Sequence, residues 1–252
     1  LWAALGKSIE IEDVGDLSRF LGRYHDVVIR EGGGEAVAFN MREYVRAACE
    51  RYAAIPGVKP FRKAQTPFCP DGSLTAADDD EKGELAAQAC SVLMKDLWAA
   101  RLARPDLTKA ITSLASKVSK RTRNHDRMLY RLMCYKWSTQ EYELIGYVND
   151  PLEDLWLELY VDADWAGDRE DKYSTNGGYL VLAGPNSKFP LAWVCRKQTA
   201  CSRSTTDSEI IALAHSLFLE ALPMMSLWDR LVRPASGRPI HCKIFENNSA
   251  TM

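Results

Sequence analysis

Three acidic residues stand where they could act together on a phosphodiester bond. Asp162 ends one alternating apolar segment, Glu209 opens a helical pattern, and Glu246 follows a second alternating segment. Carboxylate oxygens are the ligands that hard cations such as Mg²⁺ prefer, and two such ions about 4 Å apart activate a water and stabilise the leaving oxygen. The three acids therefore indicate a divalent-metal site, provided that the fold brings them together.

Each acid also has a simpler explanation. Glu209 lies three residues after Thr206, which is the spacing of a capping box at the start of a helix. The segment 162–167 is similar to part of a calcium loop, but Tyr173 stands where that loop needs a bidentate glutamate, which excludes it. Glu246 taken alone is typical of a surface residue. Both the capping role and the metal-binding role of Glu209 stay open.

The elements expected after Pro151 would bring the three acids to one end of a sheet. They are strands over residues 155–161, 178–183, 190–196 and 240–245, with a helix from residue 206 to about 222 before the last strand. Pro223 is expected to end or kink that helix, and a shorter helix over residues 224–232 is expected to continue it. Because a helix separates the last strand from the others, it must pair parallel to one of them. The order is that of an α/β fold, in which sites form at the carboxyl ends of parallel strands.

The first 150 residues are predicted to be mainly helical. Gly32-Gly33-Gly34 joins the apolar runs 24–30 and 36–39 into a β-hairpin. Helices are expected from Met41 to Tyr52 and over residues 85–102, 107–120 and 124–137, each with one apolar face. Asp106 is expected to cap the third of them. Periodicity then changes from helical to extended near residue 150, which predicts two domains, 1–150 and 151–252.

Composition bounds the protein class. The chain has 252 residues, a formal net charge of −2 and seven cysteines without a Cys-x-x-Cys pair, which indicates reduced thiols inside a cell, in the cytoplasm or nucleus, rather than a secreted protein. The longest apolar segment, residues 210–225, contains polar residues and looks too short to cross a bilayer, so no membrane is expected. Leu1 is not a start methionine, and both ends of the chain are interpreted as cuts in a longer protein.

A basic stretch precedes the predicted boundary. Such a stretch could follow the phosphates of a nucleic acid, because cationic side chains gain affinity by releasing counterions. A solvated helix face would look the same, and both interpretations stay open. Trp165 and Trp193 could stack on bases, although strand tryptophans are more often core residues. The basic residues singled out are Lys117, Lys120, Arg121 and Arg123.

Four motifs follow one another in the second half of the chain. They are Asp162-Ala-Asp-Trp-Ala-Gly-Asp168, Ser174-Thr175 before Gly177-Gly178-Tyr179, Ala192-Trp193 with Arg196-Lys197-Gln198, and Ser204-Thr-Thr-Asp-Ser-Glu209. Together they resemble the RNase H domain of copia-type retrotransposon polyproteins. In the first half, Phe20-Leu21-Gly22, Thr66-Pro67 and Arg104-Pro105-Asp106-Leu107 are similar to the tail of the reverse transcriptase of the same family.

The resemblance implies a fold and an activity. The fold would be an RNase H-like mixed sheet with helices, preceded by a mainly helical thumb or connection segment with a β-hairpin. The activity would be cleavage of RNA in RNA/DNA hybrids, with Mg²⁺ or Mn²⁺ held by the catalytic acids that match Asp162, Glu209 and the position of Glu246. The implied partners are the hybrid and the upstream polymerase part of the same polyprotein.

The sequence departs from the family pattern at one of these acids. The family has Asp where this chain has Glu246, and one extra methylene moves the carboxylate by roughly 1.5 Å, whereas a site tolerates only about 0.5 Å of misplacement. The family's last catalytic acid lies on a later helix, beyond residue 252. Its Tyr-x-Asp-Asp polymerase turn would precede Leu1, and residues 147–150 only mimic that turn. We therefore expect an impaired nuclease without a polymerase site, or a catalytically dead remnant that binds nucleic acid.

Overall fold

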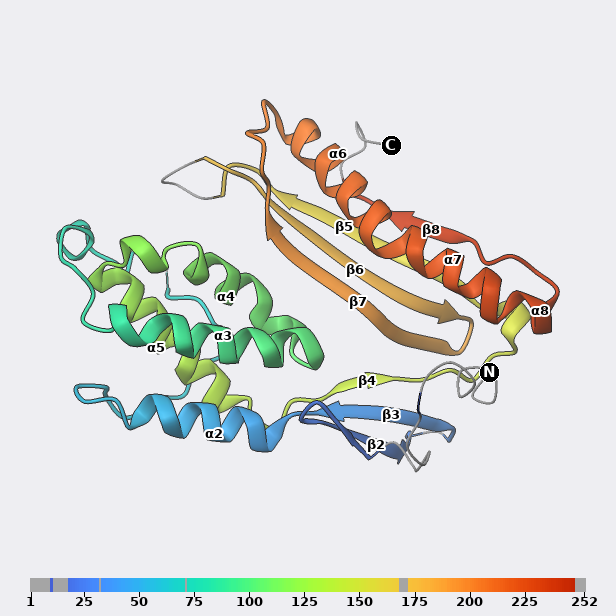
Figure 1. The fold of residues 1–252 in the computed structure, drawn as a ribbon, viewed down its shortest axis with the longest axis horizontal. Coiled ribbons are helices and arrows are strands. Elements are labelled where there is room, and N and C mark those ends of the chain that lie inside the picture. The colour runs from blue at the N-terminus through green and yellow to red at the C-terminus, as the bar shows by residue number, and fades with distance from the viewer. Residues whose placement is uncertain (1–9, 11–17, 32, 71, 168–171, 248–252) are drawn as a thin grey trace.

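Two sheets organise the chain, one in each half (Figure 1). The computed structural model describes residues 10, 18–31, 33–70, 72–167 and 172–247. Within these ranges the protein is a mixed α/β structure, as the sequence predicts. The change of sheet falls between residues 146 and 156, the segment in which the domain boundary is predicted.

The N-terminal sheet has the order β1-β2-β3-β4 and is antiparallel throughout. Its strands are β1 (Arg19–Phe20), β2 (Arg23–Ile29), β3 (Glu35–Asn40) and β4 (Leu144–Gly146). The hairpin of β2 and β3 is confirmed, and Gly33 and Gly34 adopt the positive φ values of 94° and 86° that favour glycine. The outer strands β1 and β4 were not predicted, because two or three residues are too short to show alternation.

In the described part of the first half, four helices accompany this sheet. They are α2 (Arg42–Ala53), α3 (Ala86–Leu102), α4 (Thr108–Ala115) and α5 (Arg123–Ser138), with short 3₁₀ turns at Ala76–Asp79, Pro105–Leu107 and Val118–Lys120. All four predicted helices are present, although α4 is shorter than residues 107–120 and continues only as a 3₁₀ turn. Buried side chains of α3, α4 and α5, such as Leu93, Ile111 and Leu132, form one apolar core.

The prediction that Asp106 caps α4 is wrong. The residue before α4 is Leu107, and no side chain caps this helix. The Asp106 carboxylate instead accepts hydrogen bonds from Arg104 Nε (2.9 Å) and Nη2 (2.7 Å) and from the Tyr135 hydroxyl (2.9 Å). Arg104 is buried and also donates to the Thr139 carbonyl. A bidentate pair with a buried guanidinium outcompetes a cap on exposed backbone, because the buried cation needs a partner.

The C-terminal sheet has the order β7-β6-β5-β8. Its strands are β5 (Trp156–Asp164), β6 (Thr175–Gly184), β7 (Ser187–Lys197) and β8 (Cys242–Phe245), and a 3₁₀ turn at Leu152–Asp154 precedes them. The first three strands form an antiparallel meander, and β8 pairs parallel to β5, as predicted. The parallel pair sets the carboxyl ends of β5 and β8 side by side.

A single long helical segment crosses one face of this sheet (Figure 1). It consists of α6 (Thr205–Ser216), a π-helical stretch (Leu217–Ala221) and α7 (Leu222–Leu231), and the short α8 (Arg233–Ser236) follows. Pro223 neither ends nor breaks it. Proline lacks an N–H and collides with the carbonyl four residues earlier, and the π-helical stretch widens the backbone just before that position. Ala212, Ala221 and Trp228 pack this segment against β5 and β6.

The helical segment is longer than the apolar run 210–225 that was expected to be too short to cross a bilayer. From Thr205 to Leu231 it runs for 27 residues and is long and apolar enough to cross a membrane by those two criteria alone. The expectation considered only the apolar run 210–225, which polar residues interrupt and which looked too short to cross a bilayer. In this structure the segment packs on a sheet, and Glu209 and Ser216 are buried on it. Core helices of water-soluble proteins pass the same length test, so the segment alone does not indicate a membrane protein.

The two halves meet along β7. The Trp193 indole donates from Nε1 to the Ala100 carbonyl at 2.8 Å, and the ring is half-buried at this junction. Further contacts between the halves include the Lys109–Asp164 ion pair at 2.7 Å, which reaches the end of β5, the edge-to-face pair Phe39–Phe189 with ring centroids 5.7 Å apart, and the backbone bridge Tyr147–Lys188. Trp193 therefore fastens the two halves together rather than presenting an open stacking surface.

A buried ion pair inside the first half leads to a stability prediction. Lys136 and Asp96 are both fully buried and bonded to each other. Changing Lys136→Met should lower the free energy of unfolding by about 3–5 kcal/mol, because it leaves the Asp96 carboxylate buried without its cation. Adding Asp96→Leu should recover most of that loss. Urea denaturation of the three proteins measures the effect, and equal losses in the single and double variants would contradict it.

Candidate functional site

Glu209 lies on the first turns of α6 and faces the sheet. The cap of this helix is Ser204, whose Oγ accepts from the Asp207 amide at 3.1 Å. A capping box formed by Thr206 and Glu209 is therefore ruled out, and the Glu209 carboxylate has no capping role. Its side chain is 6% exposed, and it accepts a hydrogen bond from the backbone amide of Ala163 at the end of β5.

Glu246 reaches the same end of the sheet from β8. Parallel pairing sets Phe245 opposite Tyr160, so Glu246 follows one step later, level with Val161. Its side chain is 9% exposed, and its Oε1 accepts from the Asn247 amide at 2.9 Å. Glu209 on α6 and Glu246 after β8 are thus two buried acids near the carboxyl ends of the parallel strands β5 and β8.

Asp162 is exposed and leaves β5 on the other face. Its neighbour Val161 belongs to the core beneath α6, and side chains alternate between the two faces of a strand. Asp162 lines a cavity of about 470 Å³ with Thr108 and Lys109 of α4, which lie across that other face. Its backbone position therefore matches the prediction, whereas its side chain is directed away from the other two acids.

The three acids nevertheless interact electrostatically. The pKa of Glu209 is raised to about 7, first by burial, then by the nearby charge of Glu246 and then by that of Asp162, while the Ala163 amide opposes the rise. Burial and like charges both disfavour ionisation of a carboxyl group. Perturbed carboxyl groups of this kind gather at functional sites.

The metal-binding geometry predicted for these acids stays a prediction. In the described part of the chain, no three His, Cys, Asp or Glu side chains are grouped closely enough to hold a metal ion. The outward direction of Asp162 gives a physical reason, since it separates the third carboxylate from the other two. The donor set still suits a hard divalent cation. Within the described residues Glu209 Oε2 is buried without a hydrogen-bond partner, so this oxygen is not committed to another protein group.

A buried polar network that the sequence analysis did not identify holds α6 in place. Gln198, just after β7, donates from Nε2 to Asn176 Oδ1 on β6 (2.6 Å) and to the Ser208 carbonyl on α6 (2.9 Å). Ser202 donates to Gln198 Oε1 at 2.5 Å. Ser208 precedes Glu209, so this network fixes the helix turn that carries the central acid. The only sequence signal was the motif residue Gln198, to which no role was assigned.

The basic stretch divides into residues with different environments. Arg121 has a fully buried side chain that donates to Asp126 Oδ1 at 2.6 Å and to the His125 carbonyl, so it serves the fold instead of facing phosphates. Arg123 pairs with Glu81. Lys120 is exposed, and Lys117 lines a cavity of about 560 Å³ together with Lys109 and Lys197.

Comparison with known proteins identifies the chain's relatives. No protein-family model matches. The Pol polyprotein of transposon TNT 1-94 from Nicotiana tabacum is 24% identical over 213 residues, which are 82% of this chain and 15% of that protein. The Pol polyprotein of transposon RE1 from Arabidopsis thaliana is 34% identical over 113 residues, 45% of the chain and 7% of that protein. The chain is thus similar to parts of retrotransposon Pol polyproteins, those of copia-type transposons among them.

The chain corresponds to a small part of these relatives, at most 15% of the length of the two Pol polyproteins. Secreted RxLR effector protein 161 from Plasmopara viticola is also similar, with 34% identity over 113 residues that make up 75% of that protein. The resemblance seen in the motifs is thus confirmed at the level of a Pol polyprotein fragment.

The raised pKa of Glu209 predicts how stability changes with pH. In the unfolded chain this carboxyl group titrates near its ordinary value of about 4.3, whereas in the folded protein it titrates near 7. Because the unfolded state releases its proton first, stability should fall as pH rises between about 4.5 and 7, and then level off. In metal-free buffer this contribution should be on the order of 1 to 2 kcal/mol.

Glu209→Gln should remove this contribution, since glutamine does not titrate. The measurement is the free energy of unfolding in urea at pH 5, 6, 7 and 8, with Glu153→Gln on the exposed turn before β5 as the matched control. The same slope in the wild-type and Glu209→Gln proteins would show that the central acid is not desolvated.

Proposed function

We propose that the C-terminal half of this Pol polyprotein fragment is an RNase H-type module that hydrolyses the RNA strand of RNA/DNA hybrids, at reduced efficiency. The main support is the electrostatic coupling of Glu209 to Glu246 and Asp162 at the carboxyl ends of β5 and β8. The sheet order β7-β6-β5-β8 with α6 across one face, and the four motifs, agree with such a module.

Some residues of the chain would bind the metal ion, and others would hold these ligands in position. Glu209 and Glu246 would hold Mg²⁺ or Mn²⁺ from one side, and Asp162 would contribute after its side chain turns about the strand end. A bound divalent ion supplies Lewis-acid activation of a water and charge stabilisation at the phosphate. The Ala163 amide keeps one oxygen of Glu209 oriented, and the Gln198 network keeps the helix turn beneath it fixed.

Glu246 is the residue that limits this proposal. The family has Asp at this position, and the longer side chain here turns back so that Oε1 accepts from the Asn247 amide. A carboxylate oxygen used in this way offers fewer lone pairs to a cation. Weak metal binding, rather than loss of the fold, would therefore reduce catalysis.

The cleavage assay follows directly. The purified chain should cut the RNA of a labelled RNA/DNA hybrid in the presence of Mg²⁺ or Mn²⁺. Asp162→Asn and Glu209→Gln should each lower the rate by about 100-fold or more, because each removes a negatively charged metal ligand. Asp229→Asn on α7 is the matched control and should cut normally. Equal cutting by all four proteins would assign the activity elsewhere.

The same assay separates the alternative, a remnant that binds nucleic acid without cutting it. The observation that favours this alternative is the outward direction of Asp162 together with the cavity lined by Lys109, Lys117 and Lys197. Salt-dependent binding of the hybrid with no cleavage by the wild-type chain, even with Mn²⁺, would support it.

Shortening the third acid tests the proposed impairment. Glu246→Asp should raise the cleavage rate and lower the Mg²⁺ concentration needed for half-maximal activity, on the order of tenfold or more, since misplacement by about 1 Å is costly. Glu158→Asp makes the same chemical change near the start of β5, away from the acids. It should leave the cleavage rate and the Mg²⁺ dependence unchanged. A Glu246→Asp protein with unaltered metal dependence would contradict the diagnosis.

A further inference from the structure

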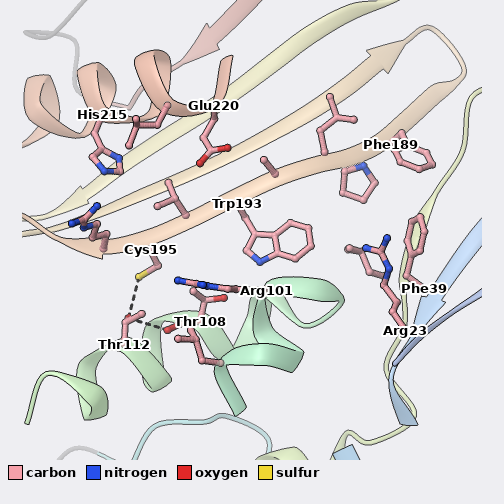
Figure 2. Close-up of a pocket in the computed structure, with 18 of the residues that line it drawn as sticks. Arg23, Phe39, Arg101, Thr108, Thr112, Phe189, Trp193, Cys195, His215 and Glu220 are labelled. Carbon is pink, nitrogen blue, oxygen red and sulfur yellow. Dashed lines mark hydrogen bonds between the residues drawn. The ribbon is translucent and has the colours of Figure 1, made fainter. Parts of the chain in front are cut away.

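A groove of about 930 Å³ follows the outer edge of β7 (Figure 2). Every residue from Phe189 to Lys197 borders it, on both faces of the strand, so the groove lies along the strand edge rather than over one face. Its two walls come from α3 and α4 on one side and from α6 and the π-helical stretch on the other. Arg101 and Thr108 lie on the first wall, and His215 and Glu220 lie on the second.

The backbone edge of β7 is open along this groove. Within the described residues β7 is the outermost strand of its sheet, and its outer edge pairs only at Lys188, which exchanges two backbone hydrogen bonds with Tyr147 (2.9 and 3.0 Å). Backbone groups facing one side alternate along a strand, so Pro190 is the next residue whose N–H would point outward. Proline has no N–H, which stops the pairing there. Leu191 is the extra residue of a β-bulge, and beyond it residues 192–197 present amide and carbonyl groups without a strand partner in the described chain.

The groove is cationic although the chain has a net charge of −2. Arg23, Arg101, Arg196 and Lys197 line it, against one acid, Glu220. Arg23 is committed to the Leu102 carbonyl at 2.9 Å. Arg101 and Arg196 have neither an ion pair nor a hydrogen bond to any residue that the structure describes. Figure 2 shows Arg101 and Glu220 on opposite sides of the Trp193 ring.

Two buried polar groups on the lining residues also lack partners. Thr108 is 8% exposed and His25 is 9% exposed, and neither Thr108 Oγ1 nor His25 Nδ1 has a hydrogen-bond partner in the described part of the chain. His25 Nε2 accepts from Arg23 Nε at 3.2 Å, and burial lowers the pKa of His25, so the neutral ring carries its proton on Nδ1. Both groups are therefore unsatisfied polar atoms buried beneath the lining of the groove.

We propose that this groove binds an extended acidic peptide, which adds to β7 as an antiparallel strand. The open edge supplies donors and acceptors in alternation, a pattern that only another peptide backbone matches at every position. A phosphodiester backbone offers acceptors alone and would leave the β7 carbonyls unpaired. The bridge at Tyr147 is already antiparallel, and the unpaired arginines suit acidic side chains. This proposal does not depend on the nuclease assignment.

The test uses the full chain and fluorescently labelled peptides. The probe is a heptapeptide in which Ile and Glu alternate, and its comparison peptide has Lys in place of Glu. The Glu peptide should bind and the Lys peptide should not. Arg101→Glu and Arg196→Glu should each weaken binding about fivefold, as expected for loss of a solvent-exposed ion pair. Arg230→Glu, on exposed α7, makes the same charge change outside the groove and should have no effect.

Backbone methylation separates strand addition from simple charge attraction. Two versions of the Glu peptide carry N-methyl groups, one on its odd-numbered and one on its even-numbered residues. Only the version methylated on the side that faces β7 should lose affinity, by about tenfold or more, because only that side donates to the strand edge. Equal affinity of both methylated peptides, or binding of a ten-residue oligothymidylate in the groove with no binding of the Glu peptide, would overturn the proposal.

Discussion

Negative charge concentrated at the ends of β5 and β8 is the constraint that the C-terminal half has to accommodate. The parallel pairing of these strands sets Glu246 beside the end of β5, and α6 brings Glu209 to the same place. Burial and the charges of Glu246 and Asp162 raise the pKa of Glu209 to about 7, so this carboxyl group is partly protonated near neutral pH. The surrounding structure is correspondingly rigid, since the Gln198 network and the Ser204 cap both fix the first turns of α6.

These fixed positions are the physical reason why we propose that a single methylene matters at Glu246. The backbone around the acids is held by buried hydrogen bonds and by a packed apolar layer under α6, and it cannot move to compensate for a longer side chain. Glu246 uses its extra length to reach the neighbouring amide instead. A loosely held site would tolerate Glu in place of Asp more easily than this one.

Much of the fold could be predicted from the sequence, because its elements carry strong periodic patterns. The helices α2, α3 and α5 and the strands β5 to β8 all have an apolar face whose repeat is visible in the residues. What could not be predicted depends on tertiary partners. Asp106 looks like a helix cap until Arg104 is found buried beside it, and Pro223 looks like a helix end until the π-helical stretch is seen. The positions of the three acids were predictable, whereas the outward direction of Asp162 follows from which face of β5 is covered by α6.

The contact between β4 and β7 carries one more consequence. β4 belongs to the N-terminal sheet, yet the chain just after it bridges to Lys188 at the start of the C-terminal one. The Trp193 indole of β7 donates to the Ala100 carbonyl of α3, and Lys109 of α4 pairs with Asp164 at the end of β5. β7 is thus attached to β6 along one edge, and to the N-terminal half at Lys188 and Trp193. A movement of one half would therefore displace β7, and through β7 it would displace the other half.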